Sequence, residues 1–87
     1  MGKLIERFVN AERVEDLIAV FGSFDENLKR IEDALNVHVV NRGTDLRVSG
    51  DEEMVDKAVR TLEGLFALAS KGEVIDEQRV RYLITLV

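Results

Sequence analysis

The sequence contains no cysteine and no proline, and its acidic residues outnumber its basic ones. Without cysteine, disulfides and thiolate metal sites are excluded, and nothing indicates an oxidising compartment. No apolar run approaches the roughly 18 residues of a membrane-spanning helix, and the first residues become charged too early for a signal peptide. No Ser/Gly-rich linker, internal repeat or low-complexity tract divides the chain. We therefore expect one folded domain, cytoplasmic and without a membrane partner.

Charge is unevenly distributed along the 87 residues. The net charge of −5 argues against a protein that binds any polyanion regardless of sequence. Residues 22–49 carry four basic and five acidic side chains, whereas residues 50–87 carry five basic and eight acidic ones. The nearly neutral middle of the chain permits local contacts with phosphate but supplies no general attraction to nucleic acid.

The N-terminal half is expected to form a strand and two helices. Residues 3–9 favour a strand, with a helix as the alternative because their alternation is imperfect. Apolar residues at helical spacing predict two helices that meet at Gly22. The first stripe is Val14, Leu17, Ile18 and Phe21, and the second is Leu28, Ile31, Ala34 and Leu35. Ser23 and Glu26 fit a capping box for the second helix, and Asp25 is an alternative cap.

The C-terminal half is expected to form a hairpin and two further helices. Residues 37–40 and 46–49 predict two strands joined by a turn at residues 41–45. A capping box from Ser49 to Glu52 opens a long helix that ends at Lys71 and Gly72. Its buried face is predicted to contain Val55, Ala58, Val59, Leu62, Leu65, Phe66 and Ala69. Asp76 is expected to cap a short helix with Val80, Leu83, Ile84 and Val87 on one face.

The predicted element order is β-α-α-β-β-α-α. It indicates an α+β fold in which helices cover one face of a three-stranded, mainly antiparallel sheet. A helix, a tight glycine turn, a second helix and a strand are the layout of a KH-type nucleic-acid-binding module. Residues 1–71 resemble the type I KH order, β-α-α-β-β-α.

A closer resemblance is to the N-terminal domain of the PhoH-like family. It extends from Leu17 to Arg81 and is carried by the phrases at residues 21–28, 41–44 and 70–73. The resemblance implies a KH-like domain followed by a P-loop ATPase domain, in cytoplasmic proteins linked to RNA metabolism, often alongside a metal-dependent endoribonuclease. Residues 1–87 are accordingly expected to be one domain, the N-terminal part of a longer protein. The P-loop pattern is absent from this sequence, so no ATP site is carried over.

The KH resemblance implies a groove between the turn at residues 22–25, the helix after it, and the strand that starts at Val37. The Gly-x-x-Gly of the KH family reads Gly22, Ser23, Phe24 and Asp25 here, with an acid in place of the second glycine. The candidate nucleic-acid-binding residues are Gly22, Ser23, Phe24, Lys29, Arg30, His38, Val40 and Arg42. Bases are expected to meet Val39 or Val40 and to be read by the edge of the strand.

Several of these turn, helix and strand residues also have a structural interpretation. Gly22 can close the preceding helix, and Asp25 can stabilise the start of the next one. Lys29 and Arg30 can pair with Glu26 and Asp33 on their own helix. Phe24 can pack as a hydrophobic staple instead of stacking on a base. His38 can be a half-exposed strand residue.

No residue pattern indicates catalysis, a metal site or a cofactor. The three serines lie at helix boundaries, and a lone histidine provides neither a metal site nor good support for nucleophilic catalysis. The sequence predicts weak binding of single-stranded RNA, which the domain would position for the ATPase domain. The alternative is a protein-interaction module whose groove no longer binds nucleic acid and whose C-terminal helix mediates assembly or oligomerisation.

Overall fold

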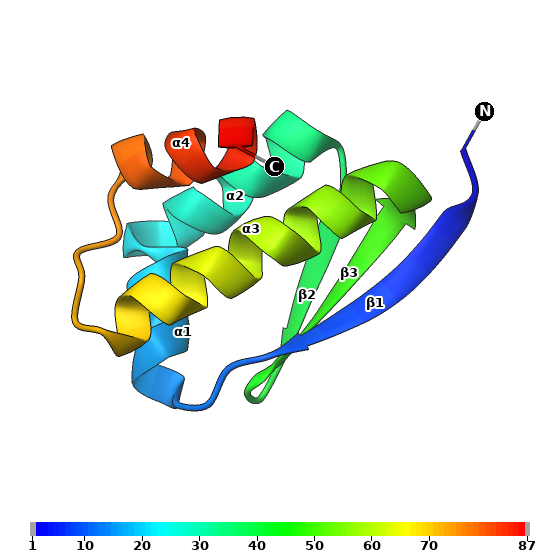
Figure 1. Cartoon of the computed structure of the whole chain (residues 1–87). Coiled ribbons are helices and arrows are strands. Elements are labelled where there is room, and N and C mark those ends of the chain that lie inside the picture. The colour runs from blue at the N-terminus through cyan, green and yellow to red at the C-terminus, as the bar shows by residue number, and fades with distance from the viewer. Residues whose placement is uncertain (1, 87) are drawn as a thin grey trace.

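The computed structural model describes residues 2–86 as four α-helices on one face of a three-stranded antiparallel sheet (Figure 1). The elements are β1 (Leu4–Asn10), α1 (Val14–Phe21), the 3-10 turn η1 (Ser23–Asp25), α2 (Glu26–Leu35), β2 (His38–Arg42), β3 (Asp45–Asp51), α3 (Glu52–Ser70) and α4 (Glu77–Leu86). The predicted element order and the α+β class are confirmed, and the segment at residues 3–9 is a strand. No helix among the described residues is long and apolar enough to cross a membrane.

The sheet has the order β1-β3-β2, which makes β1 and β2 its edges. Val9 lies opposite Leu46, and Val39 lies opposite Val48. These side chains are buried on the face that the helices cover. Successive strand residues point to opposite faces, so His38, Val40 and Arg42 lie on the uncovered face.

The hairpin between β2 and β3 is tighter than predicted. Only Gly43 and Thr44 connect the strands, and Gly43 has a φ of +63°. Arg42 therefore belongs to β2 and lies directly opposite Asp45. Two-residue hairpin loops require positive φ at their first central position, which glycine adopts without strain.

The helices form the core as predicted in α3 but not throughout α1 and α2. The buried apolar residues of α1 are Leu17, Val20 and Phe21, whereas Val14 and Ile18 are exposed. The prediction was wrong for Val14 and Ile18. Helix α1 contacts α2 and α3, and it buries the flank that contains Val20 instead. Ala34 of α2 is also exposed, although Leu28, Ile31 and Leu35 are buried as expected.

Helix ends agree with the sequence at some positions and differ at others. Gly72 has a φ of +82° and donates its N–H to Ala69 O at 2.9 Å, which ends α3 as predicted. Asp76 Oδ1 accepts the Arg79 N–H at 2.9 Å, as expected of a cap. At the start of α3, however, the cap is Asp51, which accepts the Glu53 N–H at 3.3 Å. Ser49 cannot cap this helix because it is still paired within β3.

Helix α4 packs against α2 and α3. Val80 is fully buried, Leu83 and Ile84 are partly buried, and Val87 lies outside the described residues. Leu83 Cδ1 would be 3.3 Å from a Cβ placed at Gly64 of α3, so the missing side chain of Gly64 permits the close approach of the two helices.

Candidate nucleic-acid interface

Gly22 ends α1 and redirects the chain toward α2. Its N–H donates to Ile18 O at 3.2 Å, and its backbone has φ +76° and ψ −177°. This region of backbone space is essentially restricted to glycine. A Cβ at Gly22 would also lie 2.8 Å from Asn27 Nδ2. The structural interpretation of Gly22 therefore holds, whichever ligand meets the turn.

The three residues after Gly22 form an exposed and strained turn. Phe24 and Asp25 both have left-handed backbones, with φ of +55° and +58°. That conformation costs roughly 1–2 kcal/mol for a residue with a side chain. Phe24 is 91% exposed, so its ring projects into solvent and is not a staple. Neither Ser23 nor Asp25 caps α2 with its side chain, so the predicted capping box is wrong. Asp25, which directly precedes α2, has a left-handed backbone and not the extended one of a usual cap.

Asn27 is a residue of this region that sequence reasoning missed. It is only 3% exposed and lies beneath Gly22. Its Oδ1 accepts a hydrogen bond from Arg30 Nη1 at 2.8 Å. The burial of Asn27 could have been predicted from the sequence. Asn27 precedes the apolar Ile31 by four residues, so the two residues share one helix face.

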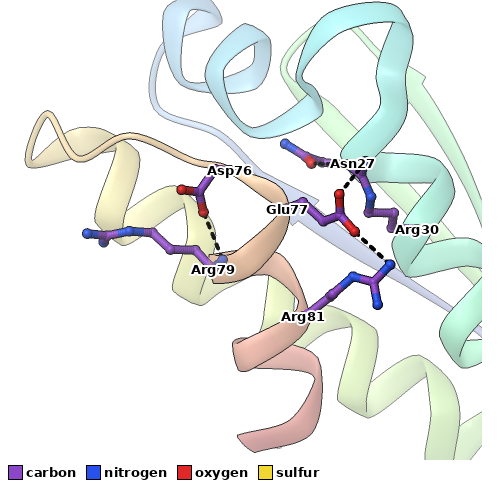
Figure 2. A network of polar contacts seen from close by, with 6 residues as sticks. All are labelled: Asn27, Arg30, Asp76, Glu77, Arg79 and Arg81. Carbon is purple, nitrogen blue, oxygen red and sulfur yellow. Dashed lines mark hydrogen bonds and ion pairs between the residues drawn. The ribbon is translucent and has the colours of Figure 1, made fainter.

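The two cations predicted on α2 have different surroundings. Lys29 is exposed and makes no ion pair among residues 2–86. Arg30 is held by Asn27 and by Glu77 of α4, whose Oε1 lies 3.2 Å from Arg30 Nη2 (Figure 2). The expected pairs with Glu26 and Asp33 do not form. Of the two residues, only Lys29 is available to a phosphate without rearrangement.

On β2, the candidate side chains lie on the uncovered face of the sheet. Val39 is buried against the helices, so the expectation that a base meets Val39 is wrong. Val40 is partly exposed, and Arg42 is exposed at the hairpin and makes no ion pair in the described part of the chain. These strand side chains lie on the face of the sheet opposite to the helix layer that contains Lys29.

The free edge of β2 is partly occupied by a carboxylate that the sequence did not identify. Glu32 of α2 accepts the Val39 N–H at 2.9 Å through Oε2. The same oxygen lies 3.6 Å from Nδ1 of the exposed His38. A base read by this edge would have to displace Glu32 from Val39. The contact depends on how α2 lies along β2, which no local spacing encodes.

Comparison with known proteins bears on the family and the fold of this chain. No protein-family model matches the sequence. The chain is 39% identical over 72 residues to a PhoH-like protein of Bacillus subtilis (strain 168), a match that covers 83% of this chain. It spans only 23% of that relative's length.

A solved structure matches the fold. The solution structure of the first KH type I domain of human vigilin superimposes with a TM-score of 0.69. The superposition covers 79% of this chain and 78% of the vigilin domain, at 18% sequence identity. At that identity the likeness establishes the fold alone. The sequence match and the fold together confirm the predicted resemblance: this chain is a KH type I-like domain related to the PhoH-like proteins.

Proposed function

We propose that this domain binds single-stranded RNA weakly, through the turn at residues 22–25 and the exposed cations Lys29 and Arg42. The observation that carries the proposal is the turn itself. In KH domains this loop clamps the nucleic-acid backbone, and here it is exposed and held in a costly conformation. Strain that the surrounding structure maintains at a surface loop is a reason to suspect function.

The proposed contacts differ from those expected from sequence. The ring of Phe24, which is exposed, would stack on a base, and such stacking contributes roughly 1–3 kcal/mol per base in single-strand binders. Lys29 and Arg42 supply separate phosphate contacts. Arg30 is engaged with Glu77, and the Val39 N–H is engaged with Glu32. Base reading by the β2 edge is therefore a secondary contribution.

The wider role follows from the family. We propose that the domain positions RNA for a P-loop ATPase domain in a longer cytoplasmic protein, and that it has no enzymatic activity of its own. The matched PhoH-like relative is more than four times as long as the matched region, which is consistent with further domains. An endoribonuclease partner would act on RNA held in this way.

The test is an NMR titration of the isotopically labelled domain with short single-stranded RNAs. Amide shifts are expected at residues 22–30 and to weaken with added salt, because phosphate contacts release counterions. Phe24→Ala and Lys29→Ala should each weaken binding. Lys3→Ala is the matched control, because Lys3 is an exposed lysine just before β1, and the start of β1 lies at the opposite end of the molecule from α1 and the start of α2 (Figure 1). No shifts at millimolar RNA, or equal binding by the Lys29 and Lys3 variants, would contradict this assignment.

A second candidate function is assembly through α4, and a specific surface favours it. Val74, Tyr82 and Leu86 are exposed apolar side chains on or beside this helix. Tyr82 also borders a cavity of about 630 Å³ between α3 and α4. Tyr82→Ser should then lower the mass measured by light scattering. Substitution of Val80 is not informative here, because a charge at this fully buried position would disrupt folding.

A further inference from the structure

Two arginines from different helices converge on one carboxylate at the start of α4. Glu77 Oε1 lies 3.2 Å from Arg30 Nη2 of α2, and Glu77 Oε2 lies 2.6 Å from Arg81 Nη2 of α4 (Figure 2). The Arg30 side chain is 28% exposed, and that of Glu77 is 48% exposed. The pairs are therefore in contact with solvent, and each contributes little to stability.

These arginines border an open cavity. The space between α2 and α4 has a volume of about 520 Å³ and is lined by Arg30, Asp33, Ala34, Arg81, Ile84 and Thr85. Its lining residues include two arginines and one acidic residue, Asp33. Guanidinium groups bind phosphate through paired N–H donors. If the Glu77 carboxylate moved away, the guanidinium groups of Arg30 and Arg81 would both be available to an anion at this cavity.

The arginine pair is also connected to the turn at residues 22–25. Asn27 accepts from Arg30 Nη1 at 2.8 Å and lies directly beneath Gly22. Arg30 therefore joins the base of the turn to Glu77. A strand that extends from the turn along this side of α2 would therefore meet the Arg30 guanidinium.

We propose that Glu77 is an intramolecular competitor for RNA phosphate. Its carboxylate occupies Arg30 and Arg81 in the free domain, and a strand phosphate replaces it in the complex. This inference rests on the proposed function, because it needs RNA bound at the turn. It predicts that α4, an element outside the six of the type I KH order, lowers RNA affinity and restricts binding to ligands that can displace Glu77.

The test compares Glu77→Gln with Glu63→Gln in the 87-residue chain. Both variants remove one negative charge, but Glu63 is exposed on α3 and makes no ion pair among residues 2–86. Glu77→Gln is expected to bind an eight-nucleotide oligouridylate about two- to fivefold more tightly than Glu63→Gln. The slope of log K against log salt should also steepen by up to about 0.7, because the one phosphate that replaces Glu77 then meets both arginines without a competing carboxylate.

Further measurements separate the outcomes. The Arg30 Nε–H resonance should shift with the oligonucleotide but not with inorganic phosphate at the same concentration. Adding Arg30→Ala to Glu77→Gln should remove the gain. Equal affinities for the Glu77 and Glu63 variants, with wild-type binding at the turn, would overturn this inference and leave the proposed function standing. A shift of equal size with inorganic phosphate would also overturn it. Absence of binding by all variants would overturn both.

Discussion

At the scale of single residues, the two ends of the turn at 22–25 tolerate substitution differently. Gly22 has a backbone that only glycine adopts easily, and it lies against Asn27. Asp25 has a left-handed backbone that aspartate adopts more readily than most residues do. The acid in place of the second KH glycine is therefore compatible with the fold. What this aspartate changes is the charge of the turn, which becomes more negative toward a ligand.

Gly22→Ala is expected to destabilise the domain by about 1–3 kcal/mol, because the new Cβ would require a disfavoured backbone and would crowd Asn27. Urea-induced unfolding measures the change. Gly43→Ala is the control, since Gly43 also has positive φ but no atom within 4 Å of an added Cβ. Its cost should be limited to about 1 kcal/mol of backbone strain. Equal losses would show that the contact with Asn27 has no energetic weight.

Asp25→Gly is expected to strengthen RNA binding, because it removes a negative charge from the turn and restores the glycine pattern of KH loops. Its free energy of unfolding should change by less than about 1 kcal/mol, since relief of left-handed strain is offset by the greater flexibility of glycine in the unfolded chain. Fluorescence anisotropy with a labelled oligonucleotide measures affinity. Asp25→Asn separates the two causes, because it removes the charge and keeps a residue that tolerates this backbone. An unchanged affinity in both variants would place RNA elsewhere.

The residues that sequence reasoning missed are those whose roles depend on neighbouring elements. Gly22, Lys29 and Arg42 were identified because a turn or an unpaired cation is visible locally. Glu32 was not singled out in the sequence, because its contact is with β2. The structural alternative for Arg30 was an ion pair within its own helix, whereas its ion pair is with α4. Side chains long enough to reach another element choose partners that only the tertiary arrangement provides.

At the scale of elements, the existence and type of each helix and strand could be predicted, but their ends and faces less well. The spacing of apolar residues was sufficient to predict the buried face of α3, because this helix is long and its buried face is wide. In the eight-residue α1, Val14 and Ile18 fit the same spacing and are nevertheless exposed. A short helix offers few positions to fix its orientation, so packing against α2 and α3 decides which flank is buried. The start of α3 also depends on tertiary contacts, because Ser49 is paired with β1 and β2 and the helix begins only after Asp51.

Asp51→Ala is expected to cost about 1 kcal/mol of unfolding free energy, because Asp51 is the residue whose side chain caps α3. Thermal or urea unfolding measures the loss. Ser49→Ala serves as the comparison and should change stability by less than about 0.5 kcal/mol, since Ser49 makes no helix cap. A larger loss for Ser49 than for Asp51 would support the capping box expected from sequence and contradict the observed start of α3.

At the scale of the whole molecule, charge limits how strongly RNA is held. The chain carries a net charge of −5, and several of its cations are engaged in ion pairs. Lys29 and Arg42 are candidate cations without such pairs in the described residues. Affinity must therefore come from local contacts at the turn and from stacking, since the overall field opposes the approach of a polyanion.

This charge balance predicts a shallow dependence of RNA binding on salt. One to three phosphate contacts would give a slope of log K against log salt between about −0.7 and −2. Arg42→Ala should reduce the magnitude of the slope by about 0.7 if Arg42 meets a phosphate. Lys57→Ala, on α3, removes the same charge away from the turn and should leave the slope unchanged. Binding isotherms at several salt concentrations, with one oligonucleotide, give all three slopes. A wild-type slope steeper than about −3 would mean that many cations act together, and the binding surface would then have to extend well beyond the turn and the hairpin.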